Sequence, residues 1–220
     1  MYCDNFFYVM NSSLMLKAIA SINEGNFSVE EFAVATGLGK SVVNDLIKFL
    51  VRNGIGSIYY DSIEFGPLDK IYATMLAIQM GTDIEDISKM LNWKDFEALA
   101  TNLLHASGFV THHGLRLKKP RMEIDVVGIK DGMALLIDCK HWKRNSQSAL
   151  KKFALMQIDR AKAFVKANKW KNRFAVPAIL TLHLESITFA NDVPVIPIIK
   201  FGSFLNELTG YLNEIKIVRG

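Results

Sequence analysis

The chain has 220 residues, half of them hydrophobic, which is enough to bury a core in one large domain or two small ones. Its formal net charge is +4. Two distant cysteines, Cys3 and Cys139, exclude a disulfide framework. No apolar run approaches the ~20 residues of a membrane span, and no basic region that would mark a signal peptide precedes the apolar stretch near the N-terminus. We therefore expect a cytoplasmic protein without a membrane partner, whose mild basic excess is compatible with a polyanion.

Short helices and a hairpin are expected at the start of the chain. An apolar stripe over residues 14–22 predicts the first helix. Ser28, followed three residues later by Glu31, has the spacing of a capping box and predicts a second helix. Residues 41–52 carry apolar side chains at helical spacing, and residues 55–65 alternate as the strands of a hairpin do.

This layout resembles a winged helix-turn-helix, and the segment FSVEEFAVATGLGKSVVNDLIKFLVRNG carries the resemblance. The resemblance implies a small, mostly helical DNA-binding module over residues 1–66. The exposed face of its third helix supplies the candidate DNA contacts Lys40, Asn44 and Lys48, although Asp45 on the same face is unfavourable beside phosphate. The alternative is a module that packs on the rest of the chain or on a second subunit.

The remainder of the chain predicts a helical connector and then an α/β domain. Residues 67–92 are expected to form the connector, and residues 93–220 the domain. The order α-β-β-β-α-β-β-α predicts a mixed central sheet flanked by helices. Asp131-Gly132 is a strong signal for a two-residue hairpin. The predicted helices are 93–107, 148–168 and 204–212, and the predicted strands are 109–117, 122–129, 133–141, 174–182 and 193–199.

Two acids and a lysine are predicted to converge at one end of this sheet. Asp138 and Lys140 are two residues apart in a strand and therefore share a face, and Asp125 lies in the preceding strand of the same hairpin. Buried charges cost several kcal/mol each unless they are compensated. Mg²⁺ prefers such oxygen ligands, and it can activate water and neutralise charge on a phosphodiester. Lys140 could orient that water or stabilise the phosphate.

Asp125 followed by Asp138-Cys139-Lys140 resembles the PD-(D/E)xK nuclease superfamily, with Ile124 in place of the usual proline. The segment FEALATNLLHASGF resembles the leading helix of archaeal Holliday-junction resolvases and Mrr-type endonucleases. The resemblance implies a restriction-endonuclease-like core, α-β-β-β-α-β. It also implies that Glu97 joins the two aspartates as a ligand of Mg²⁺, for which Mn²⁺ can substitute.

The same resemblance implies an endonuclease that hydrolyses DNA phosphodiester bonds in repair, recombination or restriction. The usual products in the superfamily are a 5′-phosphate and a 3′-hydroxyl. Many members act as dimers, so the resemblance allows a homodimer. The sequence leaves the preferred DNA structure open. A catalytically silent DNA-binding regulator or assembly protein on the same fold is one alternative, and an RNA-processing nuclease is another.

The long helix and the loops near the site add further candidates. Gln157 falls on the apolar stripe of the helix and needs a hydrogen-bond partner there. Several branches of the superfamily carry a glutamine that faces the site, so Gln157 and Arg160 are expected to position water or phosphate. The alternative is a glutamine bonded to a neighbouring backbone group. Basic side chains near the site are candidate phosphate contacts, namely Arg116, Lys118, Lys119, Arg121, Lys143 and Arg144.

Each candidate residue also has a structural interpretation. Asp125, Asp138 and Lys140 could form an ion-pair network without a metal, and Glu97 could be a solvated helix residue. Cys139 is expected to face away from the acids as a buried apolar thiol. No set of histidines and cysteines has the partners and spacing of a zinc site.

Overall fold

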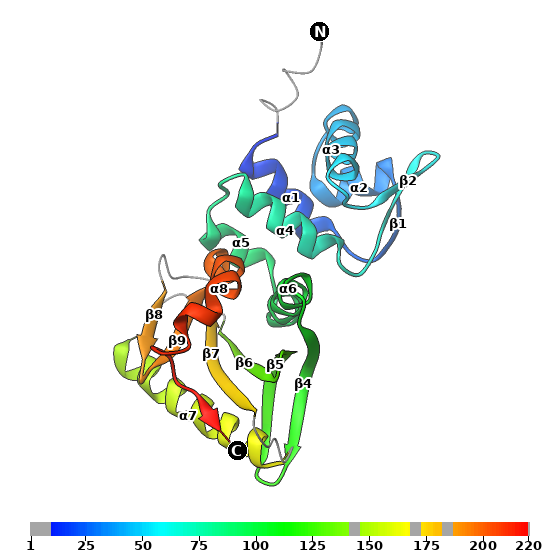
Figure 1. The fold of residues 1–220 in the computed structure, drawn as a ribbon. Coiled ribbons are helices and arrows are strands. Elements are labelled where there is room, and N and C mark those ends of the chain that lie inside the picture. The colour runs from blue at the N-terminus through cyan, green and yellow to red at the C-terminus, as the bar shows by residue number, and fades with distance from the viewer. Residues whose placement is uncertain (1–9, 141–145, 168–172, 182–186, 220) are drawn as a thin grey trace. The chain divides into compact units, whose positions relative to one another are not determined.

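The computed structural model describes residues 10–140, 146–167, 173–181 and 187–219, without the side chains of Ile84 and Ser88. The chain divides into two compact units, Met1–Leu91 and Asn92–Gly220 (Figure 1). Each unit has a hydrophobic core of its own. Among the described helices, none has the length and apolarity needed to cross a membrane.

The first unit combines helices with a small antiparallel sheet of order β1-β3-β2. The predicted capping box is present, because Ser28 and Glu31 cap each other's backbone at the start of α2. Val43, Leu46 and Leu50 are buried on one face of α3, as their spacing predicts. The elements are α1 (Ser12–Ser21), β1 (Gly25–Ser28), α2 (Val29–Thr36), α3 (Lys40–Arg52), β2 (Ser57–Tyr59), β3 (Ser62–Phe65), α4 (Asp69–Gln79) and α5 (Ile84–Met90).

Two features of this unit differ from the sequence-based expectation. Strand β1 pairs with β3, from Gly25 opposite Phe65 to Ser28 opposite Ser62, and adds a third strand to the expected hairpin. Helices α4 and α5, expected in the connector over residues 67–92, instead contribute apolar side chains to the core of the first unit. These side chains are Ala73, Ala77 and Ile87.

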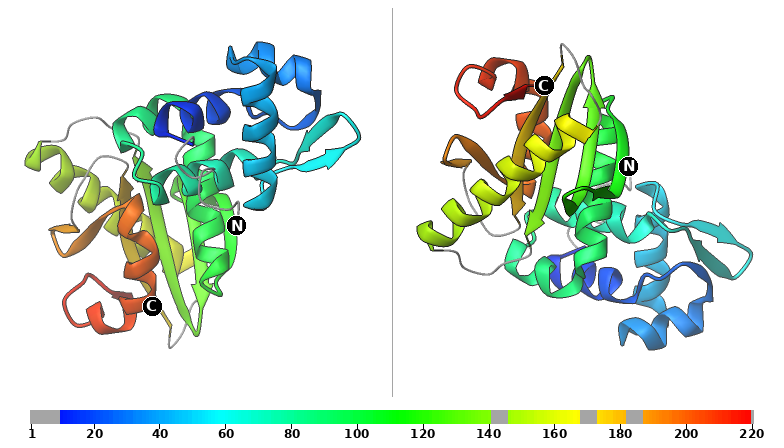
Figure 2. Two further views of the ribbon diagram at one scale, coloured as in Figure 1. Left: turned by 90° about the horizontal axis from the view of Figure 1, so that it is seen from above. Right: turned by 90° about the horizontal axis from the view of Figure 1, so that it is seen from below.

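The second unit is an α/β domain with a mixed sheet of order β4-β5-β6-β7-β9-β8, and β10 pairs with β7. Helix α7 crosses one face of the sheet, and α6 and α8 lie on the other (Figure 2). The predicted mixed sheet flanked by helices is therefore confirmed. The elements are α6 (Trp93–Ala106), β4 (Val110–Lys118), β5 (Arg121–Lys130), β6 (Met133–Lys140), α7 (Gln147–Ala167), β7 (Phe174–Thr181), β8 (Thr188–Ala190), β9 (Val193–Pro197), α8 (Ile198–Tyr211) and β10 (Val218–Arg219).

The turn between β5 and β6 confirms the hairpin predicted at Asp131-Gly132. Both residues have positive φ angles, 47° and 80°, which favour Asp and Gly in a two-residue hairpin loop. Lys130 lies opposite Met133 and begins the antiparallel ladder. The turn therefore fixes the register that brings Asp125 and Asp138 to adjacent positions on neighbouring strands.

Candidate active site

The sheet divides between β5 and β6 at the two predicted aspartates. The antiparallel ladder of these strands ends at Val126 opposite Ile137. Beyond that point β5 continues to pair with β4, and β6 continues to pair with β7. Asp125 and Asp138 are therefore the first residues past the shared ladder, one on each side of the fork.

The pairing of β5 with its other neighbour, β4, is interrupted at Asp125. On that side His113 pairs with Val126 and Leu115 pairs with Ile124, but the positions between these pairs, Gly114 and Asp125, are not paired. Gly114 has a φ of +60°. The Asp125 carboxylate instead accepts a hydrogen bond from the backbone N–H of Cys139, with 2.8 Å between Oδ2 and N. The side chain thus satisfies the N–H of Cys139, which lies past the end of the β5–β6 ladder.

The interruption also changes which face of β5 is buried against α7. Ile124 and Val127 are three residues apart, yet both belong to the apolar cluster that includes Ala161 of α7. Residues three apart in a regular strand point to opposite faces. Simple alternation along β5 therefore fails near Asp125.

Replacing Gly114 with alanine is expected to destabilise the protein by about 1–2 kcal/mol, because its φ of +60° is costly for any residue with a Cβ atom. The melting temperature should fall by roughly 2–8 °C in a chain of this size. Gly202→Ala is the matched control, because a Cβ there meets no atom within 4 Å and the residue lies within α8. That substitution should be neutral or stabilising, and equal losses in both variants would contradict a special backbone at Gly114.

Asp138 lies at the centre of a buried ion-pair network. Its side chain is 2% exposed, and Lys140 Nζ lies 2.8 Å from Oδ2 and 2.9 Å from Oδ1. Arg160 of α7 donates from Nη1 to Oδ1 at 2.8 Å. Asp138 and Lys140 therefore share the face of β6 that meets α7, as alternation predicts, and Asp138 faces two cations.

Gln157 is fully buried beside this network. Its Nε2 donates to the carbonyl oxygen of Leu136 at 2.8 Å, and its Oε1 accepts from Arg160 Nη1 at 3.1 Å. The bond to Leu136 matches the alternative in which a backbone group satisfies the glutamine. The second bond ties Arg160 to the position from which it reaches Asp138.

Glu97 of α6 is buried, and its Oε2 lies 2.6 Å from Nε2 of His113 on β4. It is therefore not the solvated helix residue of the structural alternative. Burial raises the pKa of Glu97, the hydrogen bond to His113 lowers it, and the charge of Asp125 raises it. The His113 side chain is half-exposed. Spacing in the sequence gives no signal for this pair, because the two residues meet only when α6 packs on β4.

Burial, followed by the charge of Asp138, raises the pKa of Asp125, and the hydrogen bond from Cys139 opposes the shift. Burial also raises the pKa of the Cys139 thiol well above its ordinary value, and the charges of Asp125 and Glu97 add to this effect. Cys139 lies between Asp138 and Lys140 on β6 and therefore on the other face of the strand from these two residues. The thiol is held protonated, which makes it a poor nucleophile.

The remaining predicted residues do not belong to the network described above. Lys40 forms an exposed ion pair with Glu30, and Asn44 and Lys48 are exposed on α3, all within the first unit. The basic residues at the closed end of the β4–β5 hairpin are Arg116, Lys118, Lys119 and Arg121. Lys143, Arg144 and the end of the predicted strand at His141 lie outside the described residues.

The oxygen donors at the fork suit a hard divalent cation. Within the described ranges, no three His, Cys, Asp or Glu side chains form a cluster that could hold a metal by themselves. Mg²⁺, however, commonly binds through one or two carboxylates and keeps several waters. Asp138 Oδ2 is buried and, despite its proximity to Lys140, has no hydrogen bond of good geometry. Asp125 and Asp138 therefore offer suitable oxygen ligands, and Asp138 Oδ2 can accept a further bond.

No protein-family model matches the chain, and no curated protein matches its sequence. Among solved structures, it is similar to the crystal structure of protein VC1899 from Vibrio cholerae, with a TM-score of 0.42 and 14% sequence identity. The similarity covers 96% of this chain and 53% of that chain, so this chain spans about half the length of its structural relative. A likeness at this level assigns neither a family nor a function.

Proposed function

We propose that the second unit is a metal-dependent nuclease of the PD-(D/E)xK superfamily that hydrolyses phosphodiester bonds in DNA. The segment α6-β4-β5-β6-α7-β7 would be its restriction-endonuclease-like core. One observation carries the proposal. The sheet forks between Asp125 and Asp138, so that carboxylates on two neighbouring strands flank one gap, with Lys140 bonded to the second.

In this proposal Asp125 and Asp138 hold Mg²⁺, or Mn²⁺ in its place, and Glu97 completes the acidic set. The ion would lower the pKa of a bound water and neutralise charge that develops on the phosphate. Lys140 would orient the attacking water or stabilise the phosphate oxygens. Gln157 would act through Arg160, which it holds against Asp138.

The charges of the site favour a cation together with a phosphate. Three carboxylates, Glu97, Asp125 and Asp138, and two cations, Lys140 and Arg160, give a net charge of −1 when all are ionised. A divalent ion would reverse the sign to +1, which attracts a phosphodiester. The ion would have to compete with Lys140 and Arg160 for Asp138, which suggests weak binding in the absence of substrate.

A catalytically silent nucleic-acid-binding protein is the second candidate, and the network around Asp138 favours it. Two cations already compensate this buried carboxylate without a metal. Such a network is what remains when a site serves stability alone. Cleavage distinguishes the two candidates, because the silent protein binds nucleic acid but does not cleave it with any divalent ion.

Cleavage assays with labelled duplex DNA, single-stranded DNA and RNA, with Mg²⁺ or Mn²⁺ and with a chelator, test the proposal. We expect ion-dependent cleavage of DNA by the wild type and its loss in Asp138→Ala and Lys140→Ala. Asp159→Ala is the matched control, because this acid is exposed on α7 and pairs only with Lys162 among the described contacts. Equal cleavage by all variants would reject the catalytic assignment, binding without cleavage would favour the silent protein, and cleavage of RNA alone would favour an RNA-processing nuclease.

The first unit has the element order of a winged helix-turn-helix, α1-β1-α2-α3-β2-β3, and we propose that it is such a module. Its charge argues against the DNA contact expected from Lys40, Asn44 and Lys48. Residues 1–91 contain six Lys and Arg and eleven Asp and Glu, a net charge of −5. Residues 92–220 contain twenty Lys and Arg and eleven Asp and Glu, a net charge of +9. We therefore place DNA binding on the second unit.

A further inference from the structure

The β4–β5 hairpin extends past the fork and ends in a cluster of basic side chains. Between Arg116 and Glu123 the sequence has four Lys and Arg residues and a single acid. Arg116 and Glu123 form a solvent-exposed ion pair with 3.4 Å between Nε and Oε2. The other three bases, Lys118, Lys119 and Arg121, have no ion-pair partner among the residues that the structure describes. This end of the hairpin thus carries unneutralised positive charge.

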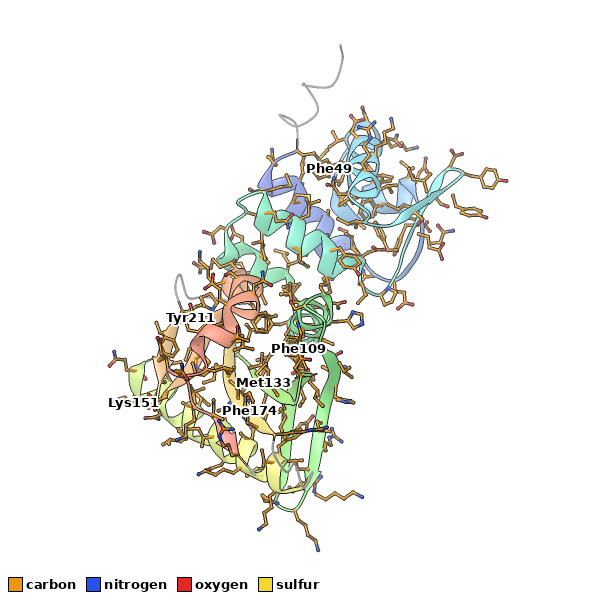
Figure 3. All side chains as sticks on the ribbon, viewed as in Figure 1. Phe49, Phe109, Met133, Lys151, Phe174 and Tyr211 are labelled. Carbon is orange, nitrogen blue, oxygen red and sulfur yellow. The ribbon has the colours of Figure 1, made fainter. Side chains whose placement is uncertain are left out.

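The register of the hairpin gathers this charge on one face. Arg116 lies opposite Glu123, and Lys118 lies opposite Arg121. Directly opposed residues of an antiparallel pair project from the same face. Leu117, which alternates with these residues, packs in the cluster that includes α7. The charged face is therefore the opposite one, and long side chains with terminal nitrogens project from the closed end of the hairpin, at the bottom of the view (Figure 3).

A pocket of about 620 Å³ lies along this hairpin. Its basic lining comes from Arg116, Lys118 and Arg121, and its apolar lining from Leu117 and Met122. Glu123, the acid of the lining, already pairs with Arg116. An anion could replace the Glu123 carboxylate at Arg116 and still meet two further cations.

Strand β5 leads from the charged end of the hairpin to the fork. Arg121 and Glu123 share a face of β5, and Asp125 follows two residues later, where regular alternation ends. Four residues of a strand span about 13 Å. Because successive base pairs are separated by about 3.4 Å along a duplex, the closed end of the hairpin lies about four base pairs from the position of Asp125.

We propose that the face of the β4–β5 hairpin formed by Arg116, Lys118 and Arg121 is a binding site for the phosphodiester backbone of nucleic acid. It would hold the backbone about four base pairs to one side of the reacting phosphate. The location of that phosphate rests on the proposed nuclease function, but the binding site does not. Lysine and arginine contacts to phosphate carry no sequence information, so this site contributes affinity and position.

Binding of the full-length protein to a labelled DNA duplex of about 20 base pairs, measured by fluorescence anisotropy in a chelator over a range of salt concentrations, tests this site. The chelator prevents cleavage, so that binding alone is measured. The variant is Arg116→Gln/Lys118→Gln/Arg121→Gln. Each lost phosphate contact lowers the salt dependence of log K by about 0.9, so we expect a slope shallower by about 2–3 and an affinity lower by at least about 10-fold.

The matched control is Lys151→Gln/Lys152→Gln/Lys162→Gln, which removes the same charge from exposed positions of α7 in the same unit. We expect its slope to change by less than about 1. Lys40→Gln/Lys48→Gln in the acidic first unit should leave binding unchanged. Equal losses in the hairpin and α7 variants, or a wild type that does not bind, would overturn the proposal.

An RNA duplex of the same length, titrated in parallel, shows whether the site binds the backbone of DNA, of RNA or of both. Hairpin-dependent binding of either nucleic acid supports the site. Failure of the nuclease proposal looks different, because the wild type would then bind through the hairpin but cleave nothing when Mg²⁺ or Mn²⁺ is added. Thermal melting of each variant confirms that these exposed substitutions leave the fold intact.

Discussion

Asp125→Asn is expected to lower phosphodiester cleavage by about 10²-fold or more and, at the same time, to stabilise the folded protein at neutral pH. The loss of activity follows if Asp125 is a metal ligand, because even residues that support ligands cost about 10–100-fold when replaced. The gain in stability follows because the carboxylate is held partly buried beside Asp138. Asparagine retains an oxygen that can accept the hydrogen bond from Cys139.

The sign of the stability change depends on pH. Burial and the charge of Asp138 raise the pKa of Asp125 above its value in the unfolded chain. The folded state therefore favours the protonated carboxyl. Its stabilising contribution is complete below the unfolded pKa and is lost as the pH rises through the folded pKa. The stability advantage of Asp125→Asn should accordingly be small in acid and larger at neutral and alkaline pH.

Urea unfolding at about pH 4 and about pH 8, with and without Mg²⁺, measures both effects. Added Mg²⁺ should increase the free energy of unfolding of the wild type by RT ln(1 + [Mg²⁺]/Kd). It should leave the free energy of unfolding of the variant unchanged. Asp159→Asn provides a control with the same change in charge at an exposed site on α7. A variant that cleaves DNA as fast as the wild type, or that still gains stability from Mg²⁺, would remove Asp125 from the metal site.

Local signals in the sequence predicted the parts of this fold that depend on neighbouring residues. Asp131-Gly132 predicted its turn because a two-residue loop needs positive φ angles. Alternation predicted that Asp138 and Lys140 share a face, since β6 is regular to its end. Strand β1 was missed because its partner β3 lies more than thirty residues away, and periodicity contains no information about pairing at that distance.

The fork itself could not be predicted from the sequence. It arises because β5 keeps its pairing with β4 while β6 keeps its pairing with β7, and no local pattern records where the two strands part. The same holds for His113, which meets Glu97 through packing of α6 on β4. Gly114 was the available signal, because a glycine within a strand often marks an irregularity near a site.

Arg160→Met is expected to destabilise the protein by about 3 kcal/mol, which would lower the melting temperature by on the order of 10 °C. Removing one member of a buried ion pair leaves the other charge without compensation. Arg160 also donates to Gln157, so the substitution removes a bond from a fully buried amide. Lys140 still faces Asp138, which places the expected loss at the lower end of the range for buried pairs.

The control for this prediction lies on the same helix. Lys162→Met breaks an ion pair with Asp159 in which both side chains are more than half exposed, so the loss should stay below about 1 kcal/mol. A double-mutant cycle with Asp138→Leu isolates the pair, because replacing both partners by apolar side chains should cost less than the sum of the single changes. Additive losses, or an Arg160→Met variant as stable as Lys162→Met, would show that Lys140 alone compensates Asp138. In that case Arg160 would be available to contact a substrate phosphate.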